Sequence, residues 1–298
     1  TGVQTCALPI YTVSGNTLTA TAGTGDAART VFTLELQPNG NYTFRLFDQL
    51  DHATGQGANS LALDLSSVIR ATDADGDALT LSQGFTLNVT DDVPKLDGWK
   101  PAGGTVEEEA LPGGNREWPN LGLVESGSVS GQVEAGADEG LTFSLNPVTT
   151  GLPTLTSGGV AVTYAVSGNT LTASAGNTTV FTLVLQTNGG YTFTLRAPID
   201  HASGNGENSR TLDLSSAIVA TDFDGDALTL SNALSIVVID DIPRDPDIEG
   251  PTWVREDAAS SITGTWRDAV GADQAGSSIV VRVGSQDHVL GSPIAVTV

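Results

Sequence analysis

Two short acidic segments with the same spacing are the part of this sequence best suited to chemistry. They read Asp73-Ala-Asp75-Gly-Asp77 and Asp222-Phe-Asp224-Gly-Asp226. Alternate side chains of a strand share one face, about 7 Å apart, and the glycine allows a turn that draws the three carboxylates around one point. Three negative charges so close together repel one another unless a cation joins them. The spacing therefore predicts a cation site at each segment.

The cation that fits this donor set is calcium. Calcium takes about six to eight oxygen ligands in flexible geometry, whereas zinc prefers Cys and His, which form no cluster in the sequence. The motif is not an EF-hand, because Gly84 and Ala233 occupy the twelfth positions, where a bidentate Glu belongs. The alternative is a turn whose carboxylates cap backbone N–H groups. Recurrence of the motif beside other acids favours calcium.

Further acidic residues lie where one repeat passes into the next, and we call these segments the junctions. If the closing strand of one repeat meets the opening strand of its neighbour, these acids complete a shared site; otherwise they form a solvated polar linker. The predicted metal ligands are Asp73, Asp75, Asp77, Asp91, Asp92, Glu108, Glu109, Asp222, Asp224, Asp226, Asp240, Asp241, Glu256 and Asp257.

A third candidate is the loop from Asp51 to Asn59, which recurs from Asp200 to Asn208. It offers oxygen atoms for a second site, but an ordinary Asx/Gly turn explains it more simply. The histidine in each loop is interpreted as a turn residue bonded to backbone, because a catalytic residue duplicated in every repeat is improbable. No serine or cysteine nucleophile motif is present, so we expect no enzymatic activity. Paired acids for glycoside hydrolysis are compatible by residue type, but these acids cluster too densely and recur.

An internal repeat of about one domain in length positions these acids. The segment from Val31 to His52 matches that from Val180 to His201 at an offset of 149 residues, and the acidic motif keeps the same offset. A third copy begins near the C-terminus, where Ser128–Val133 resembles Ser261–Trp266. Because proline stops strand pairing, the predicted divisions are 11–94 (back of repeat 1), 95–243 (complete repeat 2) and 244–298 (front of repeat 3).

The repeats have the patterns of strands and tight turns. In Tyr191–Leu195 the apolar residues share one face and the threonines the other, as in a half-buried strand. Gly168-Asn169 lies between two alternating runs, which predicts a hairpin. No segment shows sustained helical periodicity. The sequence therefore predicts an all-β protein of tandem antiparallel β-sandwich repeats, immunoglobulin-like or cadherin-like in topology.

Composition excludes several classes of partner. The chain of 298 residues has a formal net charge of −23, so it repels nucleic acid phosphates and anionic lipid headgroups. No apolar run approaches the length of a membrane span, so we expect no membrane insertion in this fragment. The expected partners are calcium ions and neighbouring repeats of the same chain.

The first ten residues are interpreted separately. Thr1 to Ile10 (TGVQTCALPI) matches the translation of a common sequencing-library adapter, so we interpret 1–10 as a scar and exclude it from fold reasoning. A native strand is the alternative. If the segment is a scar, Cys6 is foreign and the native chain has no cysteine. Disulfides then contribute nothing to its stiffness, which must come from packing or metal.

Several motifs together resemble a known family. They are Tyr-x-Val-Ser-Gly-Asn-Thr-Leu-Thr-Ala, Asn-Gly-x-Tyr-Thr-Phe, Leu-Asp-Leu-Ser-Ser, Ala-Thr-Asp-x-Asp-Gly-Asp and Asp-Asp-x-Pro. The chain after Ile10 resembles the type I secretion repeat of about 143 residues found in giant RTX adhesins, LapA-like proteins of the bacterial surface. The resemblance implies export by the type I secretion machinery to the extracellular cell surface. It also implies calcium-rigidified extender domains that serve attachment and biofilm formation.

The resemblance weakens in the third copy, where Arg255 replaces a middle acid. A carbohydrate-binding β-sandwich module of a secreted protein is the alternative function. Its support is four tryptophans that could stack on sugars: Trp99, Trp118, Trp253 and Trp266. Against it, these residues do not occupy equivalent repeat positions, and Trp266 aligns with Val133, a predicted core position.

Overall fold

The structure is a computed structural model of the chain. The described residues are 9–55, 57–98, 100–115, 122–137, 140–204, 206–244, 248–250, 263, 265–266, 271–272, 280–283 and 286–289. They contain β-strands and short 3-10 turns but no α-helix, so the prediction of an all-β protein is confirmed. No helix among them has the length and apolar character needed to cross a membrane.

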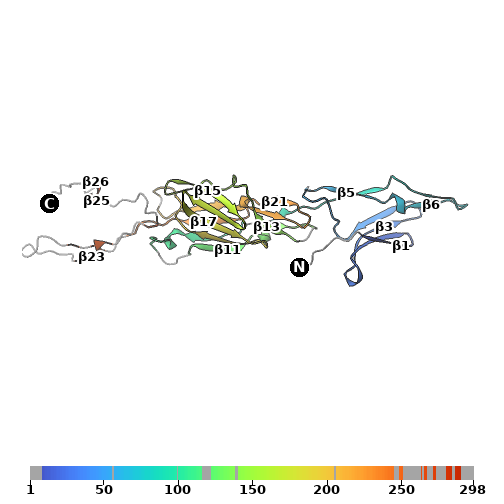
Figure 1. Ribbon diagram of the computed structural model, residues 1–298, viewed down its shortest axis with the longest axis horizontal. Coiled ribbons are helices and arrows are strands. Elements are labelled where there is room, and N and C mark those ends of the chain that lie inside the picture. Colours follow the sequence, from blue (N-terminus) through green and yellow to red (C-terminus); the bar gives the residue numbers. More distant parts are fainter. Residues whose placement is uncertain are drawn as a thin grey trace, which may run out of the picture. The chain divides into compact units, whose positions relative to one another are not determined.

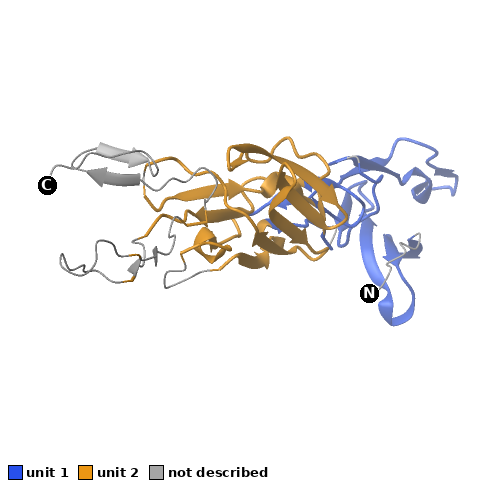
Figure 2. Ribbon diagram, turned by 60° about the vertical axis from the view of Figure 1, so that its left-hand side comes forward, with its two compact units in different colours: residues 1–97, 133–142, 220–228 blue, residues 98–132, 143–219, 229–298 orange. Residues whose placement is uncertain are grey.

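The chain, whose strands are labelled in Figure 1, divides into two compact units that are coloured separately in Figure 2. Unit 1 comprises residues 1–97, 133–142 and 220–228, and unit 2 comprises 98–132, 143–219 and 229–298. Three segments of the predicted second repeat, 95–97, 133–142 and 220–228, therefore belong to unit 1. One of them, 220–228, contains the second acidic motif.

Unit 1 contains a four-stranded sheet of order β1-β2-β3-β4 and the pairs β5-β8, β6-β7 and β9-β12. Its strands are β1 (Ile10–Ser14), β2 (Thr17–Ala22), β3 (Arg29–Leu36), β4 (Tyr42–Leu46), β5 (Ser60–Asp64), β6 (Arg70–Thr72), β7 (Ala78–Thr80), β8 (Thr86–Thr90), β9 (Lys95–Leu96) and β12 (Val133–Glu134).

Unit 2 contains a six-stranded sheet of order β11-β18-β17-β16-β15-β14 and a three-stranded sheet of order β10-β22-β19. The chain also forms a three-stranded sheet of order β13-β20-β21, and β23-β24 and β25-β26 are separate pairs. The strands of these sheets are β10 (Thr105–Glu107), β11 (Val124–Ser128), β13 (Thr142–Leu145), β14 (Thr156–Ser157), β15 (Val160–Ser167), β16 (Thr170–Ala175), β17 (Thr178–Leu185), β18 (Gly190–Leu195), β19 (Ser209–Asp213), β20 (Ile218–Thr221), β21 (Ala227–Thr229), β22 (Ser235–Ile239), β23 (Ile248–Glu249), β24 (Thr265–Trp266), β25 (Val280–Val283) and β26 (Gln286–Val289).

The sequence repeat is also a structural repeat. Tyr11 and Phe32 have ring centroids 6.1 Å apart at 57°, and the equivalent Tyr164 and Phe181 have the same separation and angle. Strands β2 and β16 share an alternating burial pattern, because period-2 side chains place every second residue against the core. The hairpin predicted at Gly168-Asn169 joins β15 to β16.

Burial of aliphatic and aromatic side chains holds each core together. In unit 2, Phe181 and Phe193 are both fully buried, with ring centroids 5.0 Å apart. Their counterparts Phe32 and Phe44 pack 5.1 Å apart in unit 1. Burying such a side chain contributes about 1.5–3 kcal/mol, so a thin core of this kind supports a repeat without disulfides.

One strand pair departs from the predicted antiparallel arrangement. Strand β10 pairs in parallel with β22, with Val106 opposite Val238 and Glu107 opposite Ile239. Parallel neighbours cannot be joined by a short hairpin, and here β10 opens the second repeat whereas β22 closes it. This pairing brings the Glu-rich segment after β10 to the end of β22, beside the acids that follow that strand.

Candidate metal centre

The first aspartate of each acidic motif closes the turn itself. Asp222 Oδ1 accepts the N–H groups of Gly225 (3.1 Å) and Asp226 (2.7 Å). Asp73 Oδ1 accepts those of Gly76 (3.0 Å) and Asp77 (2.8 Å). The glycines adopt φ of +101° and +100°, a conformation that disfavours any residue with a Cβ. The capping role considered from the sequence is thus the one that the first carboxylate performs.

The other two aspartates of the second motif meet a carboxylate from the first repeat. Asp224 and Asp226 form a cluster with Asp91, in which one ligand atom from each residue lies within 4.8 Å of the others. Asp91 follows β8, and all three residues belong to unit 1. Asp91 is 7% exposed and Asp226 is 2% exposed. We call this group the Asp91 cluster.

Buried oxygen atoms without a hydrogen-bond partner make the Asp91 cluster unusual. They are Asp91 Oδ1, Asp226 Oδ2 and both carboxylate oxygens of Asp224, judged among the described residues. A buried polar atom left without a partner costs about 1–3 kcal/mol, and more when it is charged. Such atoms point to an absent ligand. The oxygen-only donor set fits a hard divalent cation such as calcium.

Electrostatics at the Asp91 cluster agree with the geometry. Burial raises the pKa of Asp91, and the negative charges of Asp224 and Asp226 raise it further, whereas nearby His52 opposes the shift. Burial, with the facing Asp224 carboxylate, raises the pKa of Asp222 to about 7. A raised pKa means that the charged form of the carboxylate is disfavoured, as it is for both Asp91 and Asp222. A bound cation would reverse this preference.

The repeated loop at 51–59 supports the Asp91 cluster. Gly57 N–H donates to Asp226 Oδ1 (2.9 Å), and Asn59 Nδ2 donates to Asp91 Oδ2 (3.3 Å). The loop therefore does more than turn the chain, because it orients two of the clustered carboxylates. The sequence signal that pointed to it was its recurrence at 200–208.

A second cluster lies in unit 2 and contains a histidine. Glu108, His201 and Asp240 each place a ligand atom within 4.8 Å of the others. Glu108 is fully buried, and its Oε1 accepts Ile199 N–H (2.8 Å) and contacts His201 Nε2 (3.2 Å). Burial opposes protonation of His201, but Glu108 outweighs it with the help of Asp240, so the pKa of His201 is raised.

The two clusters share one local framework. His52 Nδ1 and Asn59 Oδ1 are 3.1 Å apart, as are the same atoms of His201 and Asn208. Asn208 Nδ2 donates to Asp240 Oδ2 at 3.3 Å, which matches the bond from Asn59 to Asp91. Asp240 is thus the structural counterpart of Asp91. Each repeat therefore presents an aspartate held by an Asn–His pair at the end of its closing strand.

The first acidic motif gathers its own carboxylates at the surface. Asp73, Asp75 and Asp77 form a cluster within 4.8 Å, and all three residues are exposed. The contact with Asp75 lowers the pKa of Asp73, and the N–H groups of the turn act in the same direction. The two motifs therefore have opposite pKa shifts at their first aspartate, because burial is the largest cause at Asp222, whereas at Asp73 hydrogen bonds outweigh it.

The remaining predicted ligands that the structure describes fall outside these three clusters. Asp92 and Asp241 accept backbone N–H groups. Glu109 is buried, and Asp222 caps its turn. Glu256 and Asp257 lie outside the described residues. Acidic clusters that could hold a metal ion are thus present, and they use Asp73, Asp75, Asp77, Asp91, Glu108, Asp224, Asp226 and Asp240.

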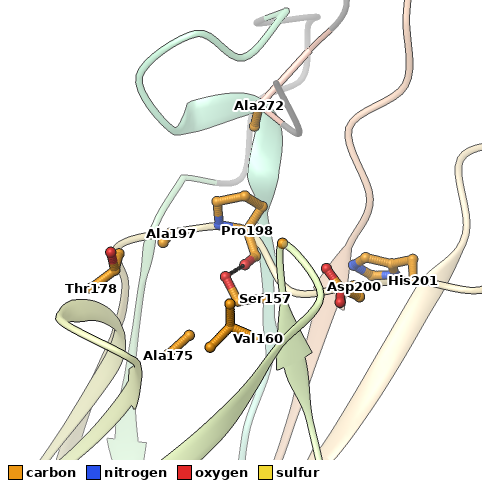
Figure 3. Close-up of a pocket in the computed structure, with 10 residues that line it drawn as sticks. Ser157, Val160, Ala175, Thr178, Ala197, Pro198, Asp200, His201 and Ala272 are labelled. Atoms are coloured by element: carbon orange, nitrogen blue, oxygen red, sulfur yellow. Dashed lines mark hydrogen bonds between the residues drawn. The ribbon is translucent and has the colours of Figure 1, made fainter. Parts of the chain in front are cut away.

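A pocket of about 630 Å³ lies in unit 2 beside His201 (Figure 3). Ser157 Oγ donates to the Pro198 carbonyl at 2.6 Å within it. Among the described residues, its lining is mostly small and apolar, with Asp200 and His201 at one side and no aromatic stacking platform. Trp99, Trp118 and Trp253, considered for sugar stacking, lie outside the described residues. The pocket therefore adds no support to carbohydrate binding.

Comparisons with known proteins returned no match from protein-family models, curated proteins or solved structures.

Proposed function

We propose that this protein is a stretch of extender repeats, stiffened by calcium, from the stalk of a bacterial surface adhesin. The observation that carries the proposal is the Asp91 cluster. Asp91 closes the first repeat, whereas Asp224 and Asp226 belong to the second, and their buried oxygens lack partners among the described residues. A cation bound there would tie one repeat to the next.

The proposed mechanism is mechanical. Without a cation, three carboxylates within 4.8 Å repel one another and oppose close contact between the repeats. Calcium would neutralise them and convert the repulsion into a crosslink. Because the ion would bind the folded state and not the unfolded chain, it would also stabilise the fold, by about 2.7 kcal/mol at a calcium concentration of about 100 times Kd.

The same chemistry supports a secreted, extracellular location. Low intracellular calcium would leave the acidic chain, of net charge −23, weakly folded for export. Higher external calcium would then drive folding at the bacterial surface. This scheme agrees with the resemblance to RTX adhesin repeats, exported by a type I secretion system for attachment and biofilm formation. The all-β architecture is compatible with immunoglobulin-like or cadherin-like sandwich repeats, the arrangement we propose.

Differential scanning calorimetry and small-angle scattering, with calcium and with chelator, test this function. We expect calcium to raise Tm and to reduce the range of conformations in solution. An unchanged Tm would contradict the stalk mechanism. A glycan array separates the alternative function, since sugar binding that survives chelation would favour a carbohydrate-binding module over a spacer.

A further inference from the structure

The two adjacent aspartates of each Asp-Asp-x-Pro junction have different surroundings. Successive side chains of an extended segment point to opposite sides. The first aspartate of each pair, Asp91 or Asp240, lies in a candidate metal cluster. The second aspartate, Asp92 or Asp241, belongs to no such cluster among the described residues, although its side chain is also a carboxylate. What the second aspartate contacts therefore defines its role.

At the first junction, Asp92 contacts a turn of the following repeat. Its Oδ2 accepts a hydrogen bond from the Ala137 N–H, with N and O 3.2 Å apart. Its Oδ1 accepts a hydrogen bond from Lys95 Nζ, with N and O 2.8 Å apart. Gly136, which precedes Ala137, packs so closely that an added Cβ would lie 2.7 Å from Asp92 Oδ2. Both carboxylate oxygens are thus occupied by N–H donors.

At the second junction, Asp241 makes the equivalent contact. Its Oδ2 accepts the Ala272 N–H at 2.7 Å, and a Cβ added to Gly271 would lie 3.0 Å from the same oxygen. Asn115 also donates, through its backbone N–H to Oδ2 and its Nδ2 to Oδ1, each at 3.1 Å. Asp241 is only 3% exposed, and donors occupy both of its oxygens.

The chain around the two contacts repeats as well. Both turns have the sequence Gly-Ala-Asp, and their glycines adopt φ of +79° and +89°. Leu96 pairs with Val133 at the first junction, and Ile248 pairs with Trp266 at the second. Val133 and Trp266 are equivalent positions in the sequence alignment. The two junctions differ in sequence, yet both have the hydrogen bond from the alanine N–H to the aspartate, the adjoining strand pair and the glycine with positive φ.

We infer that the second aspartate of Asp-Asp-x-Pro is a latch that needs no cation and positions the Gly-Ala-Asp turn of the following repeat. The first aspartate binds the cation and the second holds the turn. Because N–H donors satisfy Asp92 and Asp241, the latch forms before calcium arrives. It holds the turn in place whether or not the Asp91 cluster is occupied. The hydrogen bonds of the latch involve only protein groups, so this inference does not depend on the proposed calcium function.

Hydrogen–deuterium exchange of the Ala137 amide tests the latch in the full chain, with calcium and with chelator. We expect Asp92→Ala to speed exchange at Ala137 by about fivefold in both conditions, the effect of losing one hydrogen bond. Asp92→Asn keeps an accepting oxygen and should restore most of the protection. Asp241→Ala, read at Ala272, provides an independent second variant.

Calcium titration of the same variants separates a latch from a ligand. Asp92→Ala should leave calcium affinity within about threefold of the parent, whereas the matched Asp91→Ala should reduce it by at least about tenfold, a difference of about 1.4 kcal/mol. If calcium binding is absent altogether, the exchange result still decides the latch. Unchanged exchange at Ala137 and Ala272, or a loss of calcium affinity in Asp92→Ala as large as in Asp91→Ala, would overturn the inference.

Discussion

Neutralising the Asp91 cluster should change stability in opposite directions with and without calcium. The perturbation is the double variant Asp224→Asn with Asp226→Asn. Within the Asp91 cluster, these residues contribute three of the four buried oxygens that lack a partner among the described residues. The chain provides a matched control in Asp75→Asn with Asp77→Asn, which makes the same chemical change in an exposed copy of the motif.

The magnitude follows from the geometry. Two unit charges 4.8 Å apart repel by about 3.5 kcal/mol at an effective dielectric constant of about 20. Protonation relieves part of this repulsion, so we expect the double variant to be more stable than the parent by about 1–3 kcal/mol in chelator. In calcium at about 100 times Kd, the parent gains about 2.7 kcal/mol, which the double variant should lack.

Thermal unfolding in calcium and in chelator measures both effects. For a cooperative unit of about 150–250 residues, about 2.7 kcal/mol corresponds to a shift in Tm of about 5–11 °C. We expect calcium to raise the Tm of the parent and of the surface control by this amount, but to leave the Tm of the double variant unchanged. In chelator, the double variant should have a higher Tm than the parent. The reasoning is refuted if the double variant retains the increment, or if the surface control loses it.

Three further predictions concern titration, the second cluster and the core. The folded-state pKa of Asp222 is about 7, above its ordinary 3.8, so the folded protein keeps a proton that the unfolded chain releases. Stability of the metal-free protein should therefore fall by up to about 4 kcal/mol as pH rises from about 4 to about 7, and a flat profile, or one unchanged in Asp222→Asn, would contradict this assignment. His201→Ala removes a contact of the buried Glu108 carboxylate and should cost about 1–3 kcal/mol in urea unfolding; an effect below about 0.5 kcal/mol would show that the contact is unimportant. Phe181→Ala and its counterpart Phe32→Ala should each cost about 3–5 kcal/mol in the same assay, and near-neutral values would argue against the two equivalent cores.

Local structure was largely predictable from the sequence because its causes are local. Alternating apolar residues and threonines predicted strands such as β18, and Gly168-Asn169 predicted the hairpin. The internal repeat has a local structural counterpart, because Tyr11–Phe32 and Tyr164–Phe181 share the same ring separation and angle. The parallel pairing of β10 with β22 was missed, because strand direction depends on the path of the whole chain.

The sequence predicted that aspartates form the candidate metal clusters, but it was a poorer guide to which aspartates share a cluster. The Asp-x-Asp-Gly-Asp spacing suggested that each motif gathers its own three carboxylates, which holds for the motif that begins at Asp73. In the second motif Asp222 caps the turn, and Asp91 joins the cluster instead. This contact links residues far apart in sequence. The supporting roles of Asn59 and Gly57 depend on the same arrangement, and only the recurrence of their loop signalled them.

Anomalous diffraction from crystals grown with calcium tests the central claim most directly. We predict an anomalous peak about 2.3–2.6 Å from the oxygens of Asp91, Asp224 and Asp226, lost on soaking in chelator. No peak there at millimolar calcium, with the same oxygens bonded instead to protein donors, would contradict the account.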